Sequence, residues 1–343
     1  MSVTGTLKSI LMAPVWTAQL ATGAKSFLDH PLIGSQRLNR RGLHRTRVRI
    51  ADSLCRWRRR RLARHVPLEW RDAFDRDGFV KIENAIPAED FSALRDAILN
   101  SSWPAREMRQ GDAITRRIAI DPAMLAAVPE LARFLARKDI NALFHYVASF
   151  RTTPLHYIQT IVSKCGGSNP DPQETVHADS FHSSMKAWLF LRPVEEENGP
   201  FVYVPGSHRF TQERLDWEHE RSLSDPNSID RLSARGSPRV NSAMLAQMKL
   251  GEPIKLEVPE NTLVVADTGG FHARGHASRS GERVEIWSYS RRNPFLPWLG
   301  GDLLSLPGIA ERRIGWLWKL RDRLEKQIGQ PWNPVGTRRP VDD

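Results

Sequence analysis

The sequence predicts a mainly β protein with flanking helices, and its core is expected to be an antiparallel barrel or jelly roll. Three observations support this prediction. Short apolar or alternating segments follow one another at 157–164, 185–194, 201–205, 254–258, 262–267 and 283–290. Gly, Pro and Asn turns separate them, and the only long interruption is the polar stretch 210–250. Short strands at this density are typical of closed antiparallel architectures.

Charge divides the chain into a basic arm and a neutral body. The 343 residues are 40% hydrophobic and 26% charged, which is ordinary for a globular protein with a buried core. Residues 1–65 contain 14 Lys and Arg against only Asp29 and Asp52, whereas the remaining 278 residues hold 36 basic and 37 acidic side chains. The net positive charge of the whole chain, formally +11, therefore comes from the arm.

The cysteines and the N-terminal apolar segment indicate in which cellular compartment the protein is expected. Cys55 and Cys165 lie far apart in the sequence, so we expect no disulfide framework and a reducing environment. The run 10–24 is interrupted by Pro14 and by polar residues, which makes it a poor membrane span and a weak signal peptide. We expect a cytoplasmic protein, and attachment to the inner face of the cytoplasmic membrane is left open.

The segment 35–65 places apolar residues among many arginines, which predicts one or two basic amphipathic helices. Two interpretations remain open for this segment. It is either a solvated charge run or a surface that lies on anionic lipid or binds another polyanion.

From 66 to about 150 the pattern is mixed and mostly helical. One short strand is expected within 78–86, followed by a helix that starts at Pro87. The predicted organisation is thus an arm (1–65), a barrel domain (66–295) and a C-terminal helix and tail (296–343). The stretch 210–250 is expected to be an insert that is well placed to cover the mouth of an active site.

The segment 308–329 has the spacing of an amphipathic helix, and packing of this helix on the barrel is the simplest interpretation. Six of the eleven tryptophans lie in the two terminal regions beside basic residues. Because Trp and Arg together suit a lipid headgroup layer, residues 1–65 and 308–329 are candidates for contact with an anionic membrane.

The stretch 174-ETVHADSFHSS-184 holds the only His-x-Asp of the chain. On a strand, residues i and i+2 point to the same side, so His177 and Asp179 can offer an imidazole and a carboxylate to one metal ion. Non-haem Fe(II) oxygenases use two histidines and one carboxylate, and His272 and His276 are the candidates for the third ligand. The alternatives are a surface histidine beside a turn aspartate and a histidine in a glycine-rich turn.

An oxygenase that uses 2-oxoglutarate also needs a guanidinium group to hold the distal carboxylate of that cosubstrate. Arg283 opens the predicted strand that follows the late histidines. These features follow one another in a fixed order: strands, His-x-Asp, a Pro-Gly turn, a histidine, and a strand that begins with an arginine. This order supports the metal-site hypothesis.

Four stretches of the chain are 74–98, His177-Ala-Asp179, 198–209 and 272–283. Together they resemble the successive signatures of the phytanoyl-CoA dioxygenase family. The resemblance covers about 74–292. It implies a double-stranded β-helix (a cupin-like jelly roll), Fe(II) bound by His177, Asp179 and His272, and 2-oxoglutarate held by Arg283, with O2 as the other cosubstrate. The eleven-residue step from His272 to Arg283 is the family's step, which selects His272 over His276.

The resemblance also carries three weaker assignments. Trp188 and His208 fall on positions that line the cosubstrate pocket in relatives, and Lys164 falls on a lysine that is common at the end of the strand before the metal motif. Two departures accompany them. Arg274 stands where small residues are usual, and Glu285 should point inward beside Arg283, where a buried carboxylate must be paired unless a bulge turns it outward.

Asp179 bears on the expected reaction, because related halogenases replace this carboxylate by a small residue. We therefore expect hydroxylation of an aliphatic C–H, with release of succinate and CO2. The basic, Trp-containing ends suggest a lipid, a lipid-linked molecule or an acyl thioester as substrate at a membrane surface. Two alternatives stay open: the same chemistry on a soluble metabolite, and a non-catalytic scaffold that binds a polyanion through the arm. Nucleic-acid binding is not expected, because the arm lacks a recognisable nucleic-acid module.

Overall fold

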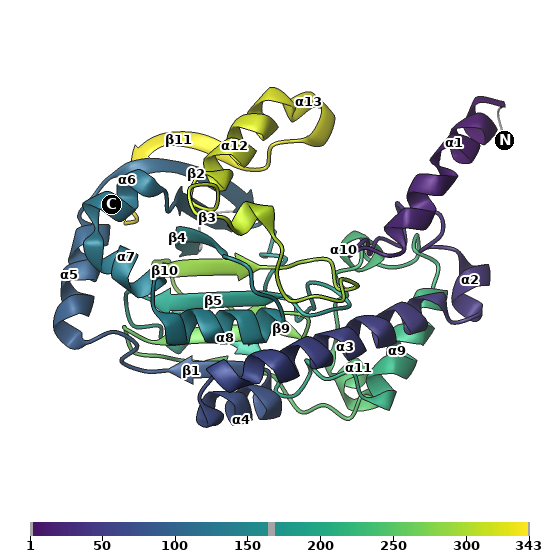
Figure 1. The fold of residues 1–343 in the computed structure, drawn as a ribbon, viewed down its shortest axis with the longest axis horizontal. Coiled ribbons are helices and arrows are strands. Elements are labelled where there is room, and N and C mark those ends of the chain that lie inside the picture. The colour runs from purple at the N-terminus through teal and green to yellow at the C-terminus, as the bar shows by residue number, and fades with distance from the viewer. Residues whose placement is uncertain (1–2, 164–168, 342–343) are drawn as a thin grey trace.

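The computed structural model describes residues 3–163 and 169–341, and its core is formed by two antiparallel sheets (Figure 1). The larger sheet has the strand order β1 (Phe79–Ile82), β8 (Leu263–Asp267), β5 (Met185–Phe190), β10 (Gly281–Ser290), β4 (Leu155–Ser163), β3 (Ala113–Ala119), β2 (Trp103–Gln110) and β11 (Asn333–Arg338). The smaller sheet has the order β7 (Ile254–Leu256), β6 (Phe201–Tyr203) and β9 (His272–Arg274). The predicted mainly β class with flanking helices is confirmed.

The prediction of a mostly helical region from 66 to 150 was wrong for one segment. Residues 103–119 form the hairpin β2–β3, which turns at Gly111 with a φ of +60° and pairs through β3 with β4. The two strands carry many charged side chains and are mostly half-buried, so they lack the apolar runs by which the other strands were recognised. The hairpin extends the larger sheet and, as described below, supplies part of the cavity wall.

Strand alternation gives the larger sheet two different faces. On β10, Val284 and Ile286 belong to the hydrophobic core that the sheet forms with its helices, whereas Trp287 belongs to the core shared with the smaller sheet. The helices of this layer are α4 (Leu68–Asp77), α5 (Ala88–Leu99), α6 (Pro122–Ala127), α7 (Pro129–Leu135) and α8 (Lys138–Ala148). One face of the sheet is thus sealed by helices, and the other is free to build a site against β6 and β9.

The N-terminal region folds into α1 (Val3–Gln19), α2 (Gln36–Arg40), α3 (Leu43–Leu62) and the short η1 (Ala63–His65). Helix α3 lies along α8 and α9 (Gln212–Leu223), whereas α1 projects away from the body (Figure 1). Buried basic side chains attach α3 to its neighbours. Arg58 donates to the carbonyl oxygens of Ser149 (3.0 Å) and Leu296 (2.7 Å), and Arg59 pairs with Asp267 at 2.7 Å. Part of the arm's positive charge therefore serves to dock the arm.

The stretch 210–250 contains α9, α10 (Arg231–Ala234) and α11 (Ser242–Gln247). After β10 come η3 (Leu303–Ser305), α12 (Arg313–Arg323) and α13 (Glu325–Ile328), and η2 (Glu196–Asn198) precedes β6. Helix α12 contacts the body through Ile314 and Trp318, while several of its other apolar side chains are exposed. Among the described residues, no helix is both long and apolar enough to cross a bilayer.

Candidate metal and cosubstrate site

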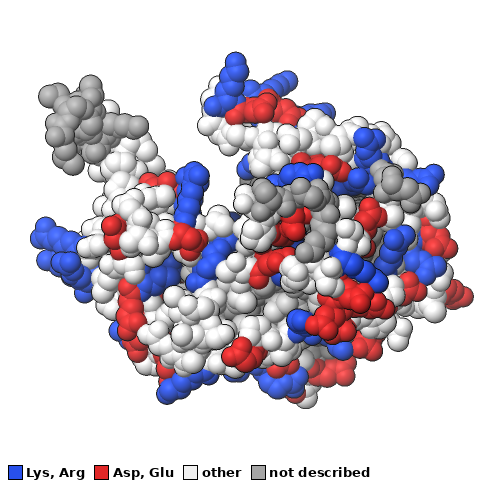
Figure 2. Space-filling model, turned by 180° about the vertical axis from the view of Figure 1, so that it is seen from behind, with Lys and Arg blue, Asp and Glu red and all other residues white. Residues whose placement is uncertain are grey.

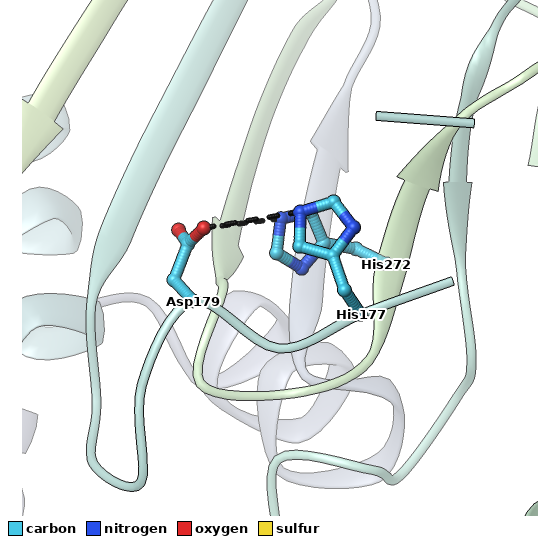
Figure 3. A group of neighbouring side chains, drawn as sticks. All are labelled: His177, Asp179 and His272. Atoms are coloured by element: carbon cyan, nitrogen blue, oxygen red, sulfur yellow. Dashed lines mark ion pairs between the residues drawn. The ribbon is translucent and has the colours of Figure 1, made fainter. Parts of the chain in front are cut away.

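The structure brings His177, Asp179 and His272 together, with one potential ligand atom of each lying within 4.8 Å of the others (Figure 3). His272 is the first residue of β9. His177 pairs with it through two backbone hydrogen bonds, each 2.8 Å long, and the Asp179 amide donates to the carbonyl oxygen of Thr268 at 2.8 Å. Asp179 Oδ1 lies 3.8 Å from His272 Nε2 and 4.0 Å from His177 Nε2.

Backbone carbonyls set the orientation of both imidazole rings. His177 Nδ1 donates to the carbonyl oxygen of Thr175 at 2.7 Å, and His272 Nδ1 donates to that of Gly270 at 3.1 Å. Each Nε2 therefore carries a lone pair and faces Asp179. His272 Nε2 is buried and has no hydrogen-bond partner within the described residues. Such an acceptor needs a ligand, and two imidazoles with one carboxylate are a donor set that suits Fe(II).

The protonation states of the three groups also suit metal binding. Burial lowers the pKa of His177 to about 4, against the opposing charge of Asp179. Burial and the neighbouring His177 lower the pKa of His272 well below its ordinary value. Burial alone would raise the pKa of Asp179, but Lys186 and the two histidines outweigh it and hold this pKa well below the usual range. At neutral pH the site thus presents two neutral rings and one carboxylate, the forms that bind a metal ion.

The second oxygen of Asp179 is held by two side chains that the sequence reasoning missed. Oδ2 accepts hydrogen bonds from Lys186 Nζ at 2.7 Å and from Thr268 Oγ1 at 2.6 Å, which leaves Oδ1 directed at the rings. A signal for Lys186 was present in the sequence, because it lies two residues before Trp188 on the same predicted strand and so shares its face. Thr268 directly follows β8, and nothing in its local sequence marked it.

A cavity of about 390 Å³ adjoins the three residues. Aromatic side chains form part of its wall, and they are Trp188, Phe201, Trp287, Tyr289 and Trp332. Arg117 of the hairpin β2–β3 also lines it, with its guanidinium carbon 4.0 Å from the centroid of the Trp287 ring. The stretch 210–250, which was expected to cover the mouth of an active site, contributes Ser237 to the cavity lining.

Arg283 lies in the same wall, 7% exposed, and is paired with the inward-pointing Glu285. Its Nε donates to Glu285 Oε2 at 2.9 Å and its Nη1 donates to the carbonyl oxygen of Gly199. Glu285 is fully buried and also accepts from Gln159 Nε2 at 2.8 Å. Pairing between β10 and β4 continues without a register shift, so no bulge turns Glu285 outward.

The other departure, Arg274, is neutralised separately by the buried Asp171, to which its Nη1 donates. Arg283 and Arg274 thus each have their own carboxylate, although both line the cavity.

Two further residues considered from the sequence lie elsewhere, and a third cannot be placed. His208 lines a different cavity, of about 670 Å³, beside α3 and α4, where its ring centroid is 5.0 Å from that of Phe74. His276 pairs on the surface with Glu174 at 3.0 Å. Lys164 lies outside the described residues. Of the two candidates for the third ligand, the fold brings His272 to the His-x-Asp pair.

The family model for phytanoyl-CoA dioxygenase matches residues 74–246, which is half of the chain. The chain belongs to this family. It is accordingly a dioxygenase dependent on Fe(II) and 2-oxoglutarate. A comparison with curated proteins finds no significant match.

Three solved structures illustrate the similarity of fold. The α-ketoglutarate-dependent epimerase SnoN of nogalamycin biosynthesis is 17% identical, and the match covers 70% of this chain and 89% of that chain with a TM-score of 0.39. HygX of Streptomyces hygroscopicus with nickel and 2-oxoglutarate bound is 18% identical, with 66% of this chain and 87% of that chain covered and a TM-score of 0.40. EctD of S. alaskensis with 2-oxoglutarate and 5-hydroxyectoine is 15% identical, with 66% of this chain and 77% of that chain covered and a TM-score of 0.40.

Proposed function

We propose that this dioxygenase hydroxylates an aliphatic C–H of a lipid, a lipid-linked molecule or an acyl substrate at an anionic membrane surface, with release of succinate and CO2. The observation that carries the proposal is the cluster of His177, Asp179 and His272, in which the buried Nε2 of His272 faces a carboxylate and has no hydrogen-bond partner in the described part of the chain. In this proposal the three side chains hold Fe(II), and Arg283 holds the distal carboxylate of 2-oxoglutarate. The bound iron and cosubstrate supply the oxidising chemistry.

The surrounding residues prepare the site for both groups. Lys186 and Thr268 fix the carboxylate plane of Asp179, and backbone carbonyls fix the two rings, so the ligands need little reorganisation when the metal binds. Within the described residues, Nη2 of Arg283 has no hydrogen-bond partner, while Nε and Nη1 are anchored to Glu285 and Gly199. This arrangement presents one edge of the guanidinium group to a carboxylate.

Asp179 supports hydroxylation as the outcome, because its carboxylate occupies the position that a halide would need. The aromatic wall formed by residues such as Trp188 and Trp287 limits the access of water to the reacting atoms. The chain's own part in the reaction is therefore to bind, to orient and to keep the site dry.

A membrane-surface substrate is supported by two projections on the same side of the molecule (Figure 1). One is α1, with Leu11 (69% exposed) and Val15 (45%). The other is α12 with α13, whose exposed apolar side chains are Trp316, Leu317, Leu320, Leu324 and Ile328. Figure 2 shows the projection formed by α12 and α13 from behind, with basic and acidic side chains beside the apolar ones. Apolar side chains among basic ones suit the headgroup region of an anionic bilayer.

Succinate release by the full-length protein, loaded anaerobically with Fe(II) and then given 2-oxoglutarate and O2, tests the chemistry. We expect succinate formation that rises when a total lipid extract is added and is abolished in Asp179→Ala. If the protein binds neither Fe(II) nor 2-oxoglutarate and forms no succinate, the enzymatic proposal is wrong. Formation that lipid does not stimulate contradicts the lipid substrate and favours a soluble metabolite.

Sedimentation with vesicles tests the membrane surface separately. The double substitution Trp316→Ser and Leu320→Ser should reduce binding to vesicles rich in phosphatidylglycerol, because it removes two of the exposed apolar side chains. The matched control is Met244→Ser on α11, which removes an exposed apolar side chain (37% exposed) outside the two projections. Equal binding of the double variant and the wild-type protein would contradict a role for α12.

A further inference from the structure

The cavity beside the metal cluster carries an excess of positive charge. Six basic side chains line it, and they are Lys25, Arg117, Lys186, Arg274, Arg283 and Arg291. Asp179 is the single acidic residue in the lining, and Glu285 and Asp171 neutralise Arg283 and Arg274 from behind the wall. Three positive charges remain after these carboxylates are counted. Fe(II) and the 2-oxoglutarate dianion would cancel each other, so the excess remains for another ligand.

Lys25 reaches this cavity from the N-terminal arm. It lies between α1 and α2, and its Nζ donates to the backbone carbonyl oxygen of Asp179. The segment that carries it is firmly attached. The buried Arg47 of α3 donates to the carbonyl oxygens of Leu20, Thr22 and Ala24 at 2.8–2.9 Å. On the other side of Lys25, the amides of Phe27 and Leu28 donate to the carbonyl oxygen of Ala234 at 2.9 and 3.1 Å. The position of Lys25 is therefore determined by the fold.

Two other cations lie close to Lys25. Lys186 of β5 bonds to the carboxylate of Asp179, and Arg291 directly follows β10; both are near enough to Lys25 to repel it. Arg291 is exposed, and no carboxylate partner for it is found within the described residues. A backbone carbonyl can accept from any neutral donor, so tying the arm to Asp179 does not require a lysine. Gathering three cations around one carboxylate is unfavourable unless an anion joins them.

We propose that Lys25 and Arg291 bind an anionic group of the substrate, a phosphate or a carboxylate, and that the arm thereby forms part of the substrate site. This inference rests on the proposed function, because it takes the His177–Asp179–His272 cluster as the reaction centre. Lys25 bonds to the main chain of Asp179 itself, so the anionic group is held beside the metal. The C–H that reacts should then lie only a few bonds from that group, near the polar end of an amphipathic substrate.

Titration of the full-length, Fe(II)-loaded protein with glycerol 3-phosphate and with glycerate tests this proposal. The titration is done under anaerobic conditions with saturating 2-oxoglutarate, and it is followed by the fluorescence of the cavity tryptophans. Glycerol serves as the neutral counterpart. We expect at least one of the two anions to bind and glycerol not to bind. Lys25→Gln should weaken that binding by about tenfold to a hundredfold, since a charge-assisted hydrogen bond is lost.

Control variants separate recognition from folding. Lys25→Arg should retain most of the affinity, and Arg291→Gln should lose part of it. Lys249→Gln removes an exposed lysine that pairs with Glu213 on the surface, and it should bind the anion like the wild-type protein. The affinity for 2-oxoglutarate, measured separately, should change less than about twofold in Lys25→Gln, because the distal carboxylate of the cosubstrate is assigned to Arg283.

Three results would overturn the proposal: unchanged anion binding in Lys25→Gln, an equal loss of 2-oxoglutarate affinity in that variant, or no binding of either anion to the wild-type protein. The titration is repeated on metal-free protein. If Fe(II) does not bind at all, the proposed function fails, and the metal-free titration still decides whether Lys25 binds anions.

Discussion

Glu218 on α9 offers a sharp test of how the arm is held on the body. Its carboxylate is fully buried and accepts from Arg214 at 3.1 and 3.2 Å, from Arg221 at 2.7 Å and from His44 of α3 at 2.9 Å. Arg214 is itself only 1% exposed. Glu218→Gln preserves the shape of the side chain but removes the charge that balances the buried guanidinium groups.

We expect this substitution to lower the free energy of unfolding by about 3–5 kcal/mol at neutral pH, the range for breaking a buried ion pair by changing one partner. Burial alone would raise the pKa of Glu218, but Arg221, His44 and Arg214 outweigh it and hold the pKa well below its ordinary value of 4.5. Since the folded-state pKa is depressed, the contribution is complete above the unfolded-state pKa. It is lost as the pH falls through the folded-state value. The difference between wild type and variant should therefore shrink in acid.

Urea denaturation followed by tryptophan fluorescence, at neutral pH and at several pH values below 4.5, measures both effects. The matched control is Glu213→Gln on the same helix, where the carboxylate pairs with Lys249 on the surface and little change is expected. A neutral-pH loss in Glu218→Gln below about 1 kcal/mol would refute the view that this buried cluster anchors the arm, since a loss that small is typical of exposed pairs.

Two further predictions concern the metal and cosubstrate site. Thr268→Val should weaken Fe(II) binding by about tenfold to a hundredfold, because Asp179 loses one of the two hydrogen bonds that orient its carboxylate. Metal titration measures this affinity. An unchanged affinity would show that Lys186 alone is sufficient to orient the carboxylate. Glu285→Gln should tighten 2-oxoglutarate binding by at least about threefold, because it removes a buried negative charge beside Arg283 while the amide oxygen can still accept from Nε. Weaker binding would show that Glu285 contributes more by anchoring that arginine than it costs by its charge.

The sequence alone determined those features that depend on short-range geometry. Alternation along a strand placed Arg283 and Glu285 on one face, and turn residues marked the strands between 155 and 292. The His-x-Asp pattern pointed to His177 and Asp179, and the resemblance to the phytanoyl-CoA dioxygenase family implied His272 and Arg283; the fold brings all four to one cavity. The alternation on β10 succeeded because the distance between residues two apart on a strand does not depend on the rest of the chain. His177 and Asp179 do not lie on a strand as expected, because His177 forms an isolated bridge and Asp179 a bend.

Tertiary structure decided the contacts that join distant segments. Whether Glu285 would meet Arg283 or another arginine, and that Lys25 would reach Asp179, could not be read from local patterns. The hairpin β2–β3 was missed, together with its Arg117, because charged strands at the end of a sheet carry no apolar signature. Several arginines of α3 proved to be buried docking groups, since a run of charges does not reveal which side chains will find a carbonyl or a carboxylate. Such partners are selected only when the packed chain excludes water and leaves each buried charge in need of one.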